Sequence, residues 1–330
     1  MQRRRVARWR RRRRRQPPDR LVWSSTVVAQ TCPPYRVGTA SWTDPTLLKA
    51  GFYPPSAKGA EARLRFYAEH FDTVEVDSTY YALPNERNAA LWAERTPDNF
   101  RFSIKAFALL TQHQADTRAL PQPVRELIPK PALQEARFGQ PTPEVLQRCF
   151  EMFRSALRPL RQADKLGCIL FQFPPWFTAR ASNEEYIDYC RERMRGDRLA
   201  IEFRHASWFG DRMQRTLDFL AGRQLALVCL DAPDAASIPK PPFTATTDVA
   251  YVRFHGHNRQ AWFHRSATAA ERFKYLYSDD ELREGAHKVR QLRGARTAYV
   301  IFNNCYGDYG VRNATTMKRL LVERESTASP

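Results

Sequence analysis

The sequence predicts an α/β protein with one TIM-type (β/α)8 barrel domain spanning residues 35–325. Eight short apolar segments, rich in β-branched and aromatic residues, follow one another from Tyr35 onward, with helix-like segments between them. Segments that are apolar on both faces are typical of parallel strands covered by helices. Eight such strands in a domain of this length favour a closed barrel. The rival, a doubly wound open sheet, requires a phosphate-binding glycine signature after the first strand, and the run from Val37 to Trp42 lacks it.

The expected strands are apolar runs of five to seven residues. They lie at residues 35–41, 73–77, 100–106, 168–173, 199–203, 225–230, 250–255 and 298–303.

Helices are expected between these strands. One is predicted over 60–71, and a longer one over 143–163 with Thr142 as its N-cap and a proline in its first turn. Capping boxes at Ser182–Glu185 and Ser278–Glu281 predict the start of two more, and a last helix is expected over 311–323.

Residues 1–34 are predicted to form a disordered basic tail, because residues 1–30 hold 11 arginines and one acid, Asp19. Such a tail fits a basic arm for nucleic acid or anionic lipid, or a targeting segment. A third interpretation is favoured over both active roles: a tail without function, or an upstream start codon with the true start inside this region, such as at Val27 or Val28.

Residues 106–142 interrupt the alternation of strands and helices and carry five prolines. In a barrel this segment is a loop on the catalytic face, where long loops cover substrate. A tolerated surface insertion is the equal alternative.

Charge and cysteines narrow the class of protein. The chain has a net charge of +18, but residues 31–330 hold 42 Lys and Arg against 34 Asp and Glu, so the folded part permits an anionic ligand without requiring one. No apolar run approaches the roughly 18 residues of a membrane span, so no membrane partner is expected.

The six cysteines are scattered without a CxxC pair, which favours reduced core thiols and a cytoplasmic location. Nothing indicates the oligomeric state.

Polar residues gather where the predicted strands end. Because side chains alternate faces along a strand, Glu75 and Asp77 share one face, opposite Val74 and Val76. The outer face of a barrel strand must be apolar, so this polar face should point into the lumen or mouth. The same pattern recurs at Ser103 and Lys105, at Glu202 and Arg204, and at Arg253 and His255, with Gln172, Asp231, Asn303 and Asn304 at other strand ends.

These residues suggest chemistry on an anion. Arginine and lysine suit phosphate or carboxylate, carboxylates suit acid–base work, and histidines suit proton transfer near neutral pH. The predicted catalytic residues are Glu75, Asp77, Lys105, Glu202, His205 and His255. The predicted substrate-binding residues are Trp42, Tyr80, Gln172, Arg204, Trp208, Arg253, Asn303 and Asn304. The carboxylates Glu75, Asp77, Glu202 and Asp231 also suit a divalent metal, but no metal site is predicted, because the His255–His257 pair has no third ligand at suitable spacing, and the cofactor is unknown.

The motifs VGTASW, DTVEVDSTYYALP, FRFSIKA, FQFPP, IEFRHASWF, YVRFHG and FNNCYG resemble the DUF72 family, the YecE-like proteins, over about residues 35–323. The resemblance implies a TIM-barrel-like fold and no particular reaction. The family pattern falls on nearly the same residues that strand parity selects, while His257 stands where a basic residue such as Arg is expected. It also marks Gly38, Ser41, Ser78, Thr79, Tyr81, Pro174, Pro175 and Gly256.

Three functions follow as hypotheses. The first is an enzyme acting on a phosphate- or carboxylate-bearing substrate, with phosphoester hydrolysis, also of a nucleic acid, as one version. The second is a non-catalytic module that binds nucleic acid, a nucleotide or a sugar phosphate. The third is a scaffold whose mouth is closed by ion pairs. The first is preferred.

Overall fold

The computed structural model describes residues 34–233, 239–263 and 269–323, so the predicted basic tail lies outside the described residues. Eight strands form one sheet in which every neighbouring pair is parallel. These strands are β1 (Tyr35–Thr39), β2 (Thr73–Val76), β3 (Arg101–Lys105), β6 (Leu166–Gln172), β7 (Arg198–Glu202), β8 (Leu225–Asp231), β9 (Val249–Phe254) and β10 (Thr297–Phe302).

The sheet closes between its first two strands. Its order is β1-β10-β9-β8-β7-β6-β3-β2, and a parallel bridge from Ala40 to Glu75 joins the two ends. The backbone N–H of Ser41 donates to the carbonyl of Glu75 at 2.8 Å. A Cβ atom on Gly38 would lie 2.0 Å from the carbonyl oxygen of Thr73, so only glycine lets β1 approach β2 here. The predicted (β/α)8 barrel is confirmed.

The barrel interior changes from apolar to polar along each strand. A buried inner cluster includes Cys168 and Leu170 on β6, Ala200 on β7 and Tyr251 on β9. Two residues further along the same face come Gln172, Glu202 and Arg253. The apolar layer therefore fills one end of the lumen, and the predicted polar residues lie at the carboxyl ends of the strands, here called the mouth.

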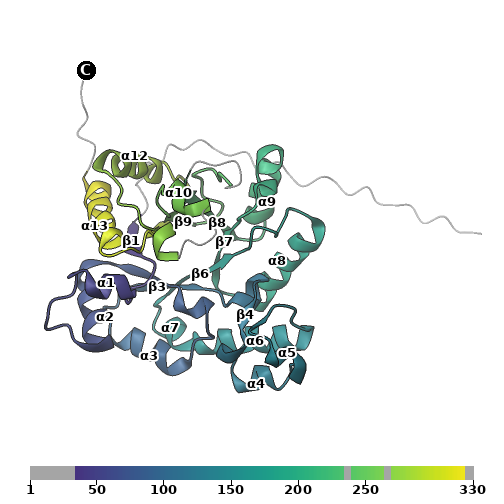
Figure 1. The fold of residues 1–330 in the computed structure, drawn as a ribbon. Helices are drawn as coiled ribbons and strands as arrows, with labels where there is room; N and C mark the ends of the chain where they lie inside the picture. Colours follow the sequence, from purple (N-terminus) through teal and green to yellow (C-terminus); the bar gives the residue numbers. More distant parts are fainter. Residues whose placement is uncertain (1–33, 234–238, 264–268, 324–330) are drawn as a thin grey trace, which may run out of the picture. The chain divides into compact units, whose positions relative to one another are not determined.

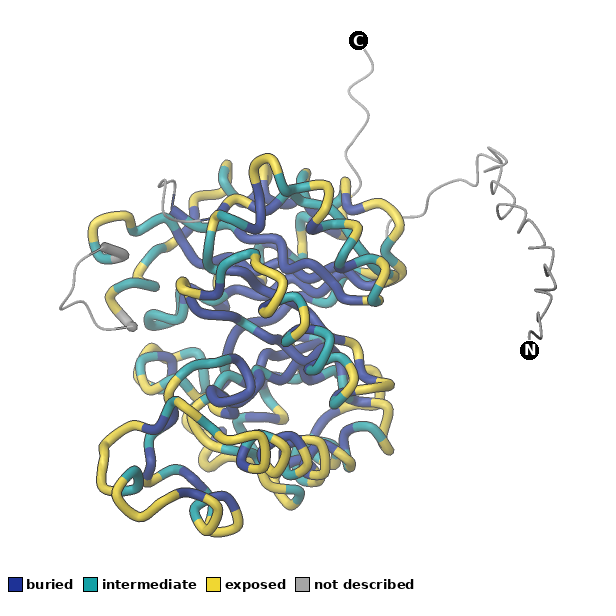
Figure 2. The backbone as a smooth tube through the Cα atoms, turned by 90° about the vertical axis from the view of Figure 1, so that its right-hand side faces the viewer, coloured by how far each residue is buried: buried dark blue, intermediate teal, exposed yellow. Residues whose placement is uncertain are grey.

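Helices surround the strands in Figure 1, and Figure 2 shows the strand backbone buried between more exposed segments. The helices are α1 (Pro45–Lys49), α2 (Gly59–His70), α3 (Glu86–Glu94), α4 (Gln122–Arg125), α5 (Lys130–Gln134), α6 (Pro143–Ala156), α7 (Arg158–Gln162), α8 (Ala181–Arg193), α9 (Met213–Ala221), α10 (Arg259–Phe263), α11 (Ala269–Arg272), α12 (Asp279–Arg290) and α13 (Tyr309–Val322).

Two helix predictions are wrong. The single helix expected over 143–163 is divided into α6 and α7. Pro159 has no N–H to donate to the carbonyl four residues earlier, and its ring conflicts with that carbonyl, which explains why the helix ends and restarts here. The capping box at Ser182 is absent, because α8 begins at Ala181 with Arg180 as N-cap. The capping box of Ser278 and Glu281 is confirmed at α12.

Residues 106–142, here called the insertion, are folded rather than one open loop. Two short antiparallel strands, β4 (Ala115–Asp116) and β5 (Arg137–Phe138), pair within it. It also holds α4 and α5, which Figure 1 shows beside α6. The side chains of Leu109, Leu120 and Val124 are buried in the main core, so the insertion is packed onto the barrel.

The predicted core thiols are confirmed for four cysteines, Cys149, Cys168, Cys190 and Cys229, which are buried and not disulfide-bonded. Burial raises the pKa of the Cys149 and Cys168 thiols to about 12. Within the described part of the chain, we find no helix with the length and apolar character needed to cross a bilayer.

Candidate active site at the barrel mouth

An inner layer of buried ion pairs crosses the lumen. Arg253 on β9 donates from Nη2 to Oε1 of Glu75 on β2 and from Nη1 to Oε2 of Glu202 on β7, each at 2.6 Å. The hydroxyl of Tyr251 donates to the other oxygen of Glu75 at 2.9 Å. None of the three charged side chains is more than 1% exposed. Arg253 was predicted to bind substrate, but both of its terminal nitrogens contact carboxylates of this chain.

Arg204, His255 and Asn303 lie against this layer. Nε of Arg204 is 2.5 Å from Oε1 of Glu202, and its Nη2 is 3.3 Å from Nε2 of His255. The amide of Asn303 contacts Nδ1 of His255 at 2.8 Å. The side chain of Arg204 remains 13% exposed, so it marks the boundary between the buried layer and the opening.

The charges of this cluster set its protonation states. Burial alone would raise the pKa of the Glu202 carboxyl, but Arg204 and Arg253 outweigh it and hold that pKa below its ordinary value. Burial, reinforced by the same two arginines, lowers the pKa of His255 well below its ordinary value. Glu202 is therefore an anion and His255 a neutral imidazole at neutral pH.

Lys105 and Asp77 form a more accessible layer, since both are partly exposed. Nζ of Lys105 lies 4.6 Å from the centre of the Tyr80 ring. The Thr79 hydroxyl donates to the Lys105 carbonyl at 2.6 Å, which ties the turn bearing Tyr80 to β3. Among the described residues, no carboxylate lies within ion-pair distance of the Lys105 ammonium.

In this layer the pKa of the lysine is lowered and the pKa of the aspartate is raised, so both lie closer to 7 than their ordinary values. Burial, helped by the positive charge of Arg253, lowers the pKa of Lys105 to about 8. Burial raises the pKa of Asp77, against the opposing effect of Lys105. Shifts of this kind are typical of functional sites.

Gln172 and His205 also lie where strands end at the mouth. Gln172 is the last residue of β6, is partly exposed and is in register with Glu202. Nδ1 of His205 accepts the backbone N–H of Ser207 at 3.0 Å and so caps a short 3-10 helix, Ala206–Trp208.

Three further predicted residues are packed among structural groups. Trp208 is 1% exposed, stacks on Phe203 with ring centres 4.1 Å apart, and donates from Nε1 to the Phe177 carbonyl at 2.7 Å. Trp42 is also buried and meets Trp92 edge-on at 5.9 Å. Asn304 donates to the Tyr275 carbonyl and to Oδ1 of Asn313, each at 2.8 Å.

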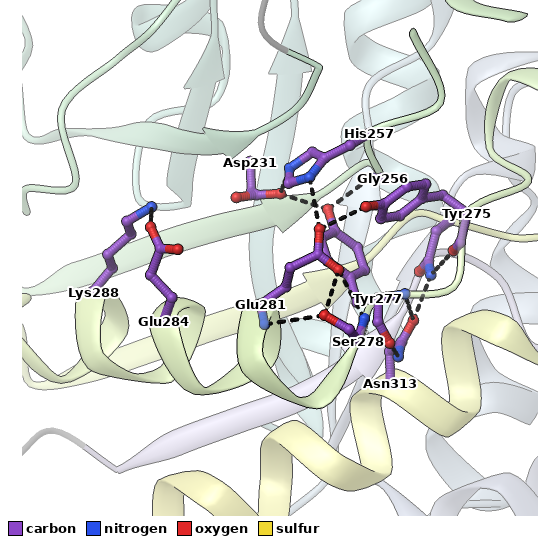
Figure 3. Close-up of polar contacts among 11 residues, drawn as sticks. Asp231, Gly256, His257, Tyr275, Tyr277, Ser278, Glu281, Glu284, Lys288 and Asn313 are labelled. Atoms are coloured by element: carbon purple, nitrogen blue, oxygen red, sulfur yellow. Dashed lines mark hydrogen bonds and ion pairs between the residues drawn. The ribbon is translucent and has the colours of Figure 1, made fainter. Parts of the chain in front are cut away.

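A second polar cluster lies beside α12 and is called the rim cluster: Asp231, His257, Tyr275, Tyr277 and Glu281 (Figure 3). Nε2 of His257 is 2.6 Å from Asp231, and its Nδ1 is 3.2 Å from Glu281. The hydroxyls of Tyr277 and Tyr275 donate to Asp231 and Glu281 respectively, each at 2.6 Å.

The two histidines of the His255–His257 pair have different partners. His255 contacts Arg204 and Asn303, whereas His257 contacts Asp231 and Glu281. The described residues contain no group of three or more His, Cys, Asp or Glu side chains that could hold a metal ion.

A cavity of about 920 Å³ opens next to the mouth, and sequence reasoning missed it. Tyr80, Trp176 and residues of the insertion line it. His113 lies in the insertion, which has no hydrophobic period, and Trp176 lies in the loop after β6, so neither residue had a recognisable pattern. Tyr251 was also missed, although it shares the strand face of Arg253 and parity could have found it.

Sequence relatives cover most of the chain. Residues 36–330 match the family described as "Protein of unknown function DUF72". UPF0759 protein YunF of Bacillus subtilis (strain 168) is 30% identical over 301 residues, which are 89% of this chain and 97% of YunF. UPF0759 protein YecE of Escherichia coli (strain K12) is 33% identical over 104 residues, 32% of this chain and 35% of YecE.

Solved structures agree with the fold. A DUF72 family protein from Enterococcus faecalis V583 superposes with a TM-score of 0.72 at 24% identity, covering 90% of this chain and 98% of that one. Another from Thermotoga maritima MSB8 gives a TM-score of 0.70 at 29% identity, covering 88% and 100%. The barrel, the family match and the end-to-end similarity to YunF lead to one conclusion: this chain belongs to the DUF72 family.

Proposed function

We propose that the protein is an enzyme that acts on an anionic substrate, bearing phosphate or carboxylate, at the mouth of the barrel, and that it hydrolyses a phosphoester. The observation that carries this proposal is Lys105, a half-buried cation with no carboxylate within ion-pair distance among the described residues. A half-buried charge without a partner has lost part of its hydration, and a bound anion compensates for that loss. Arg204 provides the second cation, at the exposed edge of the inner layer.

The assignment of roles follows from what each side chain already contacts. Both terminal nitrogens of Arg253 already donate to Glu75 and Glu202, so Arg253 holds these two carboxylates in place and does not bind the substrate. Arg204 and Lys105 hold the phosphoryl oxygens. Asp77 is the general base, because it is partly exposed and burial raises its pKa toward the range where a carboxylate accepts a proton well.

The histidines suit proton donation poorly. His255 is neutral because its pKa is lowered, and His205 already uses Nδ1 to accept a backbone N–H as a cap. Lys105, with a pKa of about 8, is still protonated at pH 7 and gives its proton to the leaving oxygen. The attacking water loses a proton to Asp77 as its oxygen forms a new P–O bond and the P–O bond to the leaving group breaks. Proton exchange with solvent then returns Asp77 and Lys105 to their starting protonation states.

Release of inorganic phosphate from a panel of phosphomonoesters tests this proposal. We expect turnover by the native chain and its loss, at least a hundredfold, in Lys105→Met and Asp77→Asn, in the range given by removal of an acid or base. Lys288→Met is the matched control, because this lysine on α12 pairs with Glu284 away from the mouth. A chain that binds phosphate but releases none from any ester would instead be a non-catalytic module for nucleic acid, nucleotide or sugar phosphate.

The location proposed for this activity is the cytoplasm. Four buried, unbonded thiols suit a reducing compartment.

A further inference from the structure

The cavity beside the mouth has walls of a particular chemistry. It measures about 920 Å³, near the upper end of the usual range for small-molecule pockets. Three aromatic rings meet along it: His113 lies 5.3 Å from Tyr80 on one side and 5.8 Å from Trp176 on the other, measured between ring centres. Trp176 is 61% exposed although tryptophan is normally buried, so its ring is available to pack against one face of a ligand ring.

The polar lining carries little net charge. Glu135 and Arg137 have opposite signs, and the amides of Gln112, Gln114 and Gln140 are neutral. Amide groups both donate and accept hydrogen bonds, as ring hydroxyls require. The lining therefore suits an uncharged, hydroxylated ring better than a second anionic group.

His113 is held as a hydrogen-bond acceptor. Gln112 before it has a φ of 60°, in the left-handed region, and this turn brings the His113 N–H to the Ala108 carbonyl at 3.0 Å. The Thr111 hydroxyl donates its proton to the Ala108 carbonyl, so it must accept from Nδ1 of His113, 2.9 Å away. Nδ1 thus carries the ring proton, and Nε2 presents a lone pair.

This acceptor stays neutral in ordinary conditions. Burial, together with the charges of Lys105 and Arg204, lowers the pKa of His113 to about 4. The two cations of the mouth are therefore close enough to act on the cavity. Tyr80 forms the junction, since its ring lines the cavity and also lies against Lys105.

We infer that this cavity is a subsite for the hydroxylated ring of a ligand whose anionic group lies at Lys105 and Arg204, the chemistry shared by a free sugar phosphate and a nucleotide. The inference rests on the proposed function, because the mouth must hold the anion. His113 accepts a ring hydroxyl through Nε2, and Trp176 covers one face of the ring.

Calorimetric titration of the full chain tests the subsite with three probes: inorganic phosphate, ribose 5-phosphate and AMP. We expect ribose 5-phosphate or AMP to bind at least about tenfold more tightly than phosphate, as one well-placed ring contact and hydrogen bond provide. Tighter binding of ribose 5-phosphate identifies a sugar phosphate, and tighter binding of AMP identifies a nucleotide.

Two variants separate the ring subsite from the anion site. Trp176→Ala and His113→Phe should reduce the tenfold advantage to less than threefold and leave phosphate affinity unchanged. Tyr81→Ala is the matched control, because Tyr81 is 63% exposed on the neighbouring turn and does not line the cavity. Thermal unfolding of each variant establishes that it is folded, and Trp176→Ala removes a side chain too exposed to support the core.

The two proposals fail in distinguishable ways. If the native chain binds none of the three probes, the proposed anion site is wrong. If it binds phosphate but gains nothing from the ring, or if the advantage survives both variants, the subsite is wrong and the anion site stands.

Discussion

The inner layer of the mouth and the rim cluster use similar contacts in different surroundings. Each pairs one cation with two carboxylates, with contacts from 2.6 to 3.2 Å, and each has a tyrosine hydroxyl on a carboxylate. The cation of the inner layer is Arg253, at most 1% exposed, whereas the cation of the rim is His257, which is 33% exposed and titratable. Burial and the choice of cation therefore separate a permanent network from one that depends on pH.

The rim cluster and the mouth also differ in whether every cation has a carboxylate at ion-pair distance among the described residues. In the rim cluster, both carboxylates contact His257 directly, so the cation of that cluster has carboxylate partners at ion-pair distance. In the mouth, Arg253 takes both glutamates, and the accessible Lys105 is left without a carboxylate at ion-pair distance among the described residues. A fixed network next to an unmatched cation is a pre-organised place for an anion.

The largest effect is expected from Arg253→Met. This change leaves Glu75 without its ion-pair partner in a dry environment, and losing one member of a buried pair costs about 3–5 kcal/mol. Urea denaturation measures the loss of unfolding free energy. The control is Arg195→Met, whose exposed pair with Glu192 should not change the midpoint measurably. A loss below about 1 kcal/mol for Arg253→Met would show that the inner layer is solvated rather than buried.

A smaller loss is expected from Tyr251→Phe. The substitution removes only the hydroxyl that donates to Glu75, and a hydrogen bond to a charged group contributes about 1.5–3 kcal/mol. Tyr299→Phe is the comparison, since this ring stacks on Tyr251 at 5.9 Å in the same interior cluster. Equal denaturation midpoints for the two variants would contradict a special role for the Tyr251 hydroxyl.

The pH dependence of anion binding tests the unmatched cation. Only the ammonium form of Lys105 attracts an anion, so affinity should fall as pH rises through about 8, by up to about tenfold per unit. Sulfate is the suitable probe, because its charge is constant over this range. Titrations from pH 7 to 9.5 should show the fall in the native chain and a flat, weaker profile in Lys105→Met. An equally steep fall in that variant would assign the effect to another group.

The smallest effect is expected from His257→Gln in the rim cluster. The hydrogen bond to Asp231 raises the pKa of His257, so its stabilising contribution is complete below pH 6.5 and is lost as pH rises through the higher folded-state value. We expect the variant to be less stable by about 1 kcal/mol at pH 6 and equal to the native chain at alkaline pH. Thermal unfolding at both pH values measures this difference in stability. The groups that face His257 are Asp231, Glu281, Tyr275 and Tyr277. A difference that grows with pH would overturn the sign.

The features that could be predicted from the sequence are those that follow a regular spacing along the chain. Alternation along a strand is local, so the eight strands and the inward direction of Glu75, Glu202 and Arg253 could be worked out without the fold. Contacts between strands are not local: nothing in the sequence indicates that Arg253 is shared by two glutamates, each more than 50 positions away. Trp42 and Trp208 show the same limit, because an aromatic residue after a strand has no periodic neighbour to fix the direction of its ring. His113 is positioned by a single left-handed turn inside an aperiodic insertion.

The closing strand of the barrel also constrains the order in which the chain can fold during its synthesis. β1 leaves the ribosome first, yet its ladder partner β10 lies over 250 residues later, and β2 offers it only the bridge at Glu75. In the barrel, β3 and each later strand can pair with a neighbour already made, whereas β1 must wait until β10 has been synthesised. The earliest strand is thus the last to be fixed in the sheet, and Glu75, which receives it, becomes fully enclosed only after β10 has been synthesised.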